Sequence, residues 1–255
     1  AEPWSLSPRA QTGFVGGPPT TTMDNSVAPS TDVDPIALHE ALVDVHGVPA
    51  EAHSEDGVRQ LLTTILSQNV ADAQTAQAAR ELYAAYPTND AIRTAGHEQL
   101  AETIAVAGLK NQKAARIQRS LERIREQTGG EYTLEFLEAM STESAHGWLT
   151  DIKGIGPKTA SVVLNFHFRR PTMAVDTHVD RLAKRYGLVE EPASNERVHE
   201  LLNELVPDEL KYPLHVLLIQ HGKQYCSARS PACANPVCEQ FCDCEGCRSE
   251  AAAES

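Results

Sequence analysis

The sequence predicts an all-α protein. Apolar residues recur at the helical period along nearly the whole stretch from 35 to 225, which gathers them on one face of each helix. No segment shows the alternation of apolar and polar residues that is typical of a half-buried strand. Glycine and proline fall between the apolar stretches, where they end one helix and begin the next. The 255 residues are enough to bury a core in one large or two modest domains.

Capping residues and helix-breaking residues mark where the expected helices begin and end. Asp34 and Pro35 suit an N-cap and a first helical residue. Pro87 and the pair Gly129-Gly130 stop later helices. The expected helices cover residues 35–46, 57–67, 72–86, 97–107, 111–128, 133–140, 144–151, 157–168, 176–186, 195–206 and 213–225.

Both ends of the chain are expected to be disordered. Residues 1–33 are rich in Pro, Gly, Ser and Thr and contain little to bury, and residues 248–255 form a short acidic end. Met23, inside the first of these segments, is a candidate for the native start.

The charge of the chain is acidic but unevenly distributed. It carries 22 Lys and Arg against 35 Asp and Glu, a net −13, and an acidic protein repels the phosphate backbone of nucleic acid. The excess acid lies in residues 1–56, 186–210 and 239–255, whereas residues 153–185 hold seven bases and two acids. The average charge therefore does not exclude nucleic acid as a partner.

Composition excludes two classes of protein. No apolar run approaches the roughly 20 residues that a membrane-spanning helix needs, and no secretory signal pattern begins the chain. We therefore expect a cytoplasmic protein with no membrane partner. All six cysteines lie between 226 and 247, which favours one clustered metal site over scattered disulfides.

The most distinctive local pattern lies in residues 149–160. Gly154 and Gly156 let the backbone turn tightly between two helices, and Pro157 begins the second, followed by Lys158 and Thr159. The pattern predicts a helix-hairpin-helix, whose free amides and helix N-terminus suit a DNA phosphate, with a monovalent cation as a candidate bridge. Such hairpins also occur in proteins without catalytic activity, where the lysine only contacts phosphate.

A second motif, Val175-Asp176-Thr177-His178, places its aspartate 18 residues after Lys158. With this pair, the chain resembles the endonuclease III branch of the helix-hairpin-helix DNA glycosylase superfamily, in which a hairpin lysine and an aspartate at this separation form the active pair. Residues 66–72, 108–114 and the segment from 221 through the cysteines also resemble motifs of that family. The resemblance covers roughly residues 35–245.

The resemblance implies that Lys158 and Asp176 are catalytic. A position in the first turn of a helix, and partial burial, both lower the pKa of an ammonium and make a neutral amine available. That amine attacks C1′ of a flipped nucleotide, displaces the base and holds the sugar as a Schiff base, after which β-elimination nicks the strand. Asp176 would stabilise the cationic sugar and assist proton transfers, or only cap the next helix. His178 is expected to pack or cap.

Flipping a base leaves a space that the protein must fill. By resemblance, Gln68 or Asn69 enters that space or faces the orphaned base, and Leu109 wedges into the opposite strand. The family often has Gln where Asn69 falls. The alternatives are capping of a helix C-terminus for the two amides and a core position for Leu109. Gly154, Gly156 and Thr159 of the hairpin complete the expected DNA contacts.

Several further basic residues are candidates for phosphate contacts. One group lies after the 108–109 loop and either follows the phosphates or forms a solvated helix face, and a second group lies near the cysteines and is expected to approach DNA. The first group is Lys110, Lys113, Arg116 and Arg119, and the second is Lys211, Lys223 and Arg229.

The cysteines resemble the cluster loop of the same family, with one departure. Cys226 and Cys233 enclose six residues, as in the family's loop that holds a [4Fe–4S] cluster through four thiolates. The third family position falls on Pro236, and the next cysteine is Cys238. The cluster is expected to have a structural role.

Two choices remain for the fourth ligand. Cys242 preserves the family's overall span and the apolar residue before it, Phe241, and is preferred. Cys244 preserves the gap that follows Cys238. A zinc site stays open because Cys244 and Cys247 form a C-x-x-C pair.

The resemblance also implies the fold and the activity. The expected fold has a six-helix barrel lobe at 57–170 and a cluster lobe made of 34–56 and 171–247, with damaged double-stranded DNA in the cleft between them. The implied function is that of a monomeric base excision repair glycosylase with apurinic/apyrimidinic lyase activity on oxidised pyrimidines. The alternatives are a uracil or mismatched-thymine glycosylase on the same fold, and a non-catalytic helix-hairpin-helix DNA-binding protein.

The balance of basic residues adds an expectation about the environment. Seven lysines against fifteen arginines, with so many acids, predict a prokaryotic cytoplasm of high ionic strength, as in a halophile. Stability and activity are then expected to rise with molar KCl. Because salt weakens phosphate contacts, binding would depend on the hairpin amides, the wedge and the pocket for the flipped base.

Overall fold

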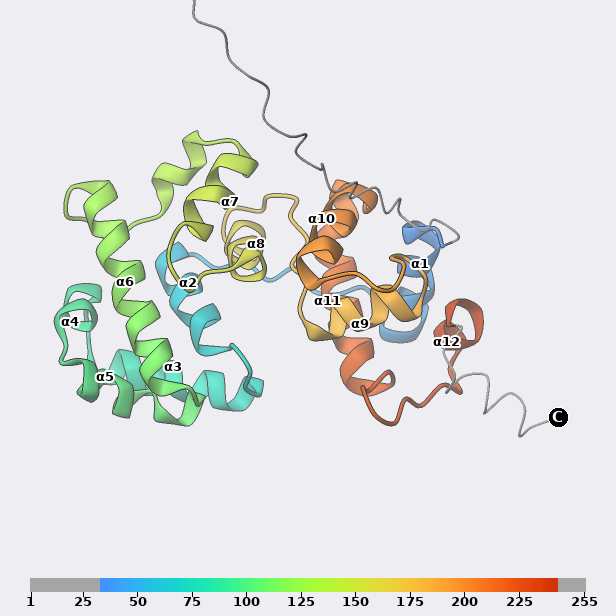
Figure 1. The fold of residues 1–255 in the computed structure, drawn as a ribbon, viewed down its shortest axis with the longest axis horizontal. Helices are drawn as coiled ribbons and strands as arrows, with labels where there is room; N and C mark the ends of the chain where they lie inside the picture. The colour runs from blue at the N-terminus through green and yellow to red at the C-terminus, as the bar shows by residue number, and fades with distance from the viewer. Residues whose placement is uncertain (1–32, 243–255) are drawn as a thin grey trace, which may run out of the picture.

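All regular structure is helical between residues 33 and 242, the part of the chain that the computed structural model describes (Figure 1). No strand occurs in that range, so the predicted all-α class is confirmed. Met23 lies outside it. The helices are α1 (Pro35–His46), α2 (Gly57–Leu66), α3 (Asp72–Ala85), α4 (Asn89–Thr94), α5 (His97–Thr103), α6 (Lys110–Thr128), α7 (Thr142–Thr150), α8 (Pro157–Phe166), α9 (Thr177–Arg185), α10 (Asn195–Leu205), α11 (Lys211–Gln224) and α12 (Pro236–Phe241), with 3-10 turns η1 (Ala105–Ala107), η2 (Glu135–Ala139) and η3 (Asp208–Leu210).

Side-chain caps begin many of these helices. Asp34 accepts a hydrogen bond from the amide of Ile36 (3.0 Å) at the start of α1, as expected. Asp56 accepts one from the amide of Arg59 (2.9 Å) at the start of α2. Gly129 ends α6 in the left-handed conformation, with φ of 73°, which is the role that the glycine pair predicts.

Two predicted helices are wrong in detail. The helix expected at 97–107 is interrupted at Ile104, whose φ of −101° and ψ of 15° leave the helical region, so that α5 is followed by the separate turn η1. The helix expected at 133–140 is only the five-residue 3-10 turn η2. Two short helices, α4 and α12, were not expected, because six residues carry too little periodicity to stand out.

The helices bury two separate hydrophobic cores. The first core is formed by residues between Val58 and Leu164, from α2 through α8. The second core combines Leu38 and Leu42 of α1 with residues between Met173 and Cys238. Figure 1 shows the corresponding groups of helices, α2 to α7 on one side and α1 with α9 to α12 on the other. Within residues 33–242 no helix has the length and apolar character to cross a membrane.

The chain passes between the two cores twice, and the two connections lie side by side. The amide of Ser54 donates to the carbonyl of Phe166 (2.9 Å), and Nδ1 of His167 lies 2.6 Å from the carbonyl of Ser54. A Cβ at Gly57 would lie 2.7 Å from the His167 ring, so this crossing requires glycine there. The close pairing fixes how α8, and the residues at its start, face the second core.

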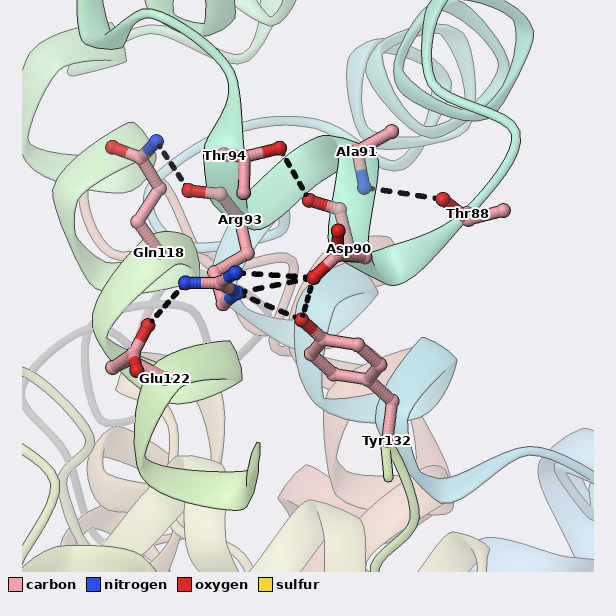
Figure 2. A network of polar contacts seen from close by, with 8 residues as sticks. All are labelled: Thr88, Asp90, Ala91, Arg93, Thr94, Gln118, Glu122 and Tyr132. Carbon is pink, nitrogen blue, oxygen red and sulfur yellow. Dashed lines mark hydrogen bonds and ion pairs between the residues drawn. The ribbon is translucent and has the colours of Figure 1, made fainter. Parts of the chain in front are cut away.

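A polar network holds the outer end of the first core together (Figure 2). The Arg93 guanidinium of α4 donates to Glu122 of α6 (2.7 Å), to the hydroxyl of Tyr132 (2.8 Å) and to Asp90 (3.1 Å). The hydroxyl of Tyr132 in turn donates to Asp90 (2.7 Å), which together with Arg93 lowers the pKa of that carboxyl. The network ties α4 to α6, and it includes none of the predicted site residues.

Candidate active site

A cavity of about 1050 Å³ lies where the two groups of helices meet. It is lined by the α2–α3 loop with the start of α3, the start of α8, and the segment that leads into α9 with the start of that helix. One residue of α6, one of α10 and two of α11 complete the lining. Both halves of the predicted catalytic pair line it. The lining residues are Ser67 to Asp72, Gln74, Arg116, Gly156 to Thr159, Val175 to His178, Asp180, Asn195, Ile219 and Lys223.

The hairpin before α8 is built as the sequence predicts. Ile152 and Ile155 anchor it in the first core, each with 4% of its surface exposed, and the Ile155 amide donates to the Ile152 carbonyl (2.9 Å). Gly154 has φ of 101°, in the region that favours glycine, and a Cβ there would lie 2.7 Å from Cγ of Arg116. A Cβ at Gly156 would meet nothing within 4 Å. The hairpin backbone at Gly156 is therefore open to a ligand.

Lys158 is the second residue of α8 and is half-buried at the cavity. Burial lowers the pKa of its ammonium, and the Asp176 carboxylate opposes that shift. Burial has the larger effect, so a neutral amine is more accessible at Lys158 than at an exposed lysine.

Asp176 caps α9 and also lines the cavity. Its Oδ1 accepts hydrogen bonds from the amides of His178 (2.8 Å) and Val179 (2.9 Å). Capping and a catalytic position are therefore not alternatives in this structure, because the cap fixes the carboxylate next to the cavity that Lys158 lines. His178 packs as expected: its Nδ1 lies 3.0 Å from the Arg181 guanidinium, and its ring is close to Gly222.

A buried histidine behind the pair was not expected from the sequence. Nδ1 of His215, in α11, lies 2.8 Å from the carbonyl of Ala174, two residues before Asp176. A carbonyl only accepts, so Nδ1 carries the proton. Burial lowers the pKa of His215 strongly enough to outweigh the attraction of Asp176, so the His215 ring is neutral at pH 7 and adds no positive charge near Asp176.

Gln68 and Asn69 lie in the loop after α2, at the edge of the cavity. The Gln68 amide donates to Oγ1 of Thr159 (3.2 Å), the neighbour of Lys158, and Arg116 donates to its carbonyl oxygen. Ser67, not Gln68, follows the last residue of α2, and its hydroxyl donates to the Thr64 carbonyl (2.9 Å). Capping of α2 thus does not occupy the two amide side chains.

Leu109 is exposed rather than part of the core. It has 48% of its surface exposed and a backbone φ of 46°, in the left-handed region. Asn69 also has a left-handed backbone, with φ of 57°. A large apolar side chain held outward in a strained backbone is unusual and points to contact with a partner.

The candidate phosphate-binding residues of α6 lie in different surroundings. Arg116 lies against Gly154, and Nε of Arg119 donates to the Lys153 carbonyl (3.3 Å), so both lie beside the hairpin. Lys110 is paired with Glu102. Lys113 was expected to contact phosphate or to lie on a solvated helix face. Both expectations are wrong, because its side chain is fully buried.

The basic residues near the cysteines also differ in burial and in their partners. Lys211 is buried, with 7% of its surface exposed, and pairs with Asp208 (2.7 Å), so the expectation that it approaches DNA is wrong. Lys223 lines the cavity and pairs with Asp72 (2.8 Å), which joins α11 to the start of α3. Arg229 is exposed.

Four cysteines gather at one end of the second core. Cys226, Cys233 and Cys238 are buried and Cys242 is half-buried, and none forms a disulfide. Cys238 lies in the first turn of α12 and Cys242 directly follows the helix, so both face the same side. Cys244 and Cys247 lie outside the described residues.

The surroundings of these thiols suit thiolates. A hydrogen bond with Cys242, aided by His221 and the hydroxyl of Tyr186 (3.6 Å), lowers the pKa of Cys238 to about 3. The Arg185 guanidinium lies 3.0 Å from Sγ of Cys226. Within the described range, no three His, Cys, Asp or Glu side chains converge on one metal ion. Four cysteines at one end of the second core, with hydrogen-bond donors around them, fit the ligand set of a [4Fe–4S] cluster.

Comparison with known proteins agrees with this geometry. Residues 62–208 match the model of the HhH-GPD superfamily of base excision DNA repair proteins. Endonuclease III of Thermotoga maritima is 31% identical over 195 residues, covering 76% of this chain and 86% of that protein. Endonuclease III of Escherichia coli K12 is 35% identical over 184 residues, covering 72% and 82%.

Two further similarities complete the comparison. An Arabidopsis thaliana protein named for DNA glycosylase activity is 35% identical over 173 residues, but the chain spans only 59% of its length. A solved structure of a trapped covalent intermediate of endonuclease III with DNA aligns with a TM-score of 0.72 and 25% identity, covering 85% of this chain and 96% of that one.

Proposed function

Because the chain belongs to the HhH-GPD superfamily of base excision DNA repair proteins, we propose that its cavity is the active site of a DNA glycosylase with apurinic/apyrimidinic lyase activity, with Lys158 and Asp176 as the catalytic pair. The observation that carries this proposal is their juxtaposition in one cavity at the end of a helix-hairpin-helix. One is a lysine with a lowered pKa, and the other is a carboxylate that caps the start of α9. The partner is double-stranded DNA with a damaged base or an abasic site, bound by a monomer.

The reaction needs a nucleotide flipped out of the duplex, and the cavity has room for one. Nζ of Lys158, as the neutral amine, attacks C1′ of the sugar. The C1′–N bond breaks, and its electron pair leaves with the base, which takes up a proton. Asp176 accepts a proton that the attacking nitrogen releases and stabilises positive charge that develops on the sugar.

The lyase step follows from the same nitrogen. Opening of the sugar ring converts the adduct into a protonated Schiff base between Nζ and C1′, which acidifies C2′. Loss of a C2′ proton expels the 3′ phosphate and breaks the strand by β-elimination. Water then hydrolyses the C=N bond and returns the free amine of Lys158.

The remaining predicted residues have distinct roles in holding DNA. The backbone at Gly154 and Gly156 and the N-terminus of α8 bind a phosphate, with a monovalent cation as a candidate bridge. Gln68 and Asn69 approach the flipped base or its orphaned partner, and the exposed Leu109 enters the stack from the other strand.

We infer that Cys226, Cys233, Cys238 and Cys242 would hold a [4Fe–4S] cluster. The buried thiols and the donors around them support this assignment. When bound, the cluster would cross-link residues 226 to 242 to one another, and Arg181 and Arg185 of α9 bind the Cys226 end of that segment. Four irons per chain, with absorbance near 400 nm, are expected; stoichiometric zinc without iron would reject the cluster.

The substrate is an oxidised pyrimidine, and a panel of duplexes tests this. Duplexes that carry thymine glycol, uracil, mismatched thymine or an abasic site are incubated with the protein, with and without borohydride. Cutting and trapping on thymine glycol support the proposal. Selective release of uracil or thymine favours the alternative glycosylase, and no cutting or trapping on any duplex favours a non-catalytic DNA-binding protein.

A further inference from the structure

Lys113 is a buried cation bound only to backbone oxygens. No part of the residue is exposed, and its Nζ donates to the carbonyls of Leu66 (2.8 Å) and Ala107 (2.6 Å). Among the described residues, no carboxylate forms an ion pair with it. Burial, with the nearby Arg116, lowers the pKa of Lys113 to about 8.

These two carbonyls belong to the last residues of the two elements that precede the loops proposed to enter DNA. Leu66 is the last residue of α2, and the next residues lead to Gln68 and Asn69. Ala107 is the last residue of η1, and Leu109 follows two positions later. Carbonyls at helix ends lack partners within the helix and attract cations, so one ammonium satisfies the ends of both elements.

The two loops also lie next to each other and carry strained backbone. A Cβ added to Gly108 would lie 3.7 Å from Cγ1 of Val70, so only a methyl-sized space separates the loops there. Asn69 and Leu109 are both left-handed non-glycine residues. Such conformations persist only where the surroundings hold them, and the carbonyls that Lys113 binds lie three residues before Asn69 and two residues before Leu109.

The helix that carries Lys113 connects these loops to the hairpin. One turn further along α6, Arg116 contacts the Gln68 side chain and packs on Gly154. The face of α6 that holds Lys113 and Arg116 therefore sets the spacing between the two loops and the phosphate-binding hairpin.

We propose that Lys113 is a positioning residue that fixes the Gln68–Asn69 loop and the Leu109 loop relative to each other, so that both enter a DNA duplex together when a nucleotide is flipped. This inference rests on the proposed function. It assigns to Lys113 a role in insertion and none in chemistry, because its ammonium is enclosed and contacts no reacting atom.

The test separates insertion from chemistry and from general DNA binding. All variants are made as the cluster-containing full chain with Lys158→Gln, which removes the nucleophile. A duplex carries 2-aminopurine opposite an abasic-site analogue, so that its fluorescence reports unstacking by the inserted loops. Lys113→Met removes both donors, Lys113→Gln keeps an uncharged NH₂ with two donors, and Arg125→Met changes an exposed residue of the same helix.

We expect the fluorescence increase to be smallest in Lys113→Met, intermediate in Lys113→Gln and unchanged in Arg125→Met. Lys113→Met lowers the fluorescence increase at saturating protein about fivefold or more, while the Kd for undamaged duplex changes less than about twofold, because the hairpin is intact. Lys113→Gln recovers about half of the signal, and Arg125→Met equals the parent. Lys113→Gln still tests the inference if Lys113→Met does not fold.

Two outcomes would overturn the inference. The first is an unchanged fluorescence increase in Lys113→Met. The second is an equal loss for damaged and undamaged duplex in both Lys113 variants, which would indicate a general loss of structure. Failure of the proposed function is recognised separately, because a chain that retains Lys158 would then trap no DNA with borohydride.

Discussion

The Asp176 carboxylate raises the pKa of Lys158 against the stronger lowering effect of burial. Both residues line the same cavity, and the same carboxylate caps α9 through two amides. The aspartate therefore influences the charge of the lysine and the stability of its own helix, and these two effects can be separated by substitution.

Asp176→Asn keeps a side-chain oxygen for the cap but removes the charge. Without the carboxylate, the pKa of Lys158 falls further, so the acid limb of the pH profile for single-turnover cleavage moves to lower pH. The rate on the plateau falls roughly 100-fold, because the proton acceptor and the stabilising charge are lost. Kinetics from pH 5 to 9 on a lesion duplex measure both effects.

Asp176→Ala is the matched control for the cap. It removes the charge and the cap, so it lowers the free energy of unfolding by about 1 kcal/mol relative to Asp176→Asn. Equal activity of wild type and Asp176→Asn across this pH range would exclude a catalytic role for the carboxylate.

The two hairpin glycines predict opposite responses to alanine. Gly154→Ala requires a left-handed alanine and a collision with Arg116, so it lowers the free energy of unfolding by about 1 to 3 kcal/mol. Gly156→Ala meets no protein atom and leaves the Tm unchanged. Its methyl group instead faces the phosphate, and we expect the Kd for DNA to rise about tenfold. Thermal unfolding and DNA titration distinguish them; an unchanged Kd in Gly156→Ala would argue against phosphate binding there.

The fourth cluster ligand can be tested by two serine substitutions. Cys242→Ser removes a thiolate that interacts with the Cys238 side chain, so the purified protein loses most of its iron and its absorbance near 400 nm. Cys244→Ser is the comparison and keeps about four irons per chain. The reverse pattern, with iron lost only in Cys244→Ser, would assign the ligand to Cys244.

We expect the folded protein to lose stability in mild acid because of a pair of histidines. His199 of α10 lies 5.7 Å from His146 of α7, measured between ring centroids, and its Nε2 lies 2.9 Å from the hydroxyl of Ser161 in α8. Burial lowers the pKa of His199 to about 4. Because the folded pKa is below the unfolded value, the stabilisation is complete above pH 6.5 and is lost as the pH falls.

Between pH 7 and pH 4 the loss from His199 is roughly 2 to 3 kcal/mol. Urea unfolding at several pH values measures it, and His199→Asn is expected to flatten the curve in that window. A curve for His199→Asn parallel to that of wild type would assign the acid sensitivity to other groups.

The sequence predicts the long helices and the hairpin well because their signals are local. Asp34 and Gly129 act through their own neighbours, and Gly154 needs its backbone conformation whatever surrounds it. The exposed Leu109 was anticipated only through the family resemblance, since an apolar side chain after a glycine fits a core position equally well.

Residues whose roles depend on distant contacts could not be predicted. Lys113 looks like a surface lysine on a basic helix, and only the convergence of α2 and η1 shows that it is buried. Likewise, His215 is one of several histidines in the sequence, and its position behind Asp176 follows from the packing of α11.

The most direct test of the account is to locate the covalent bond. The protein is incubated with a thymine glycol or abasic duplex and borohydride, digested, and the DNA-modified peptide is identified by mass spectrometry. The account predicts a single adduct on Lys158, absent in Lys158→Gln but present in Lys184→Gln, whose ammonium pairs with Asp180. An adduct on another amine, or continued trapping by Lys158→Gln, would contradict it.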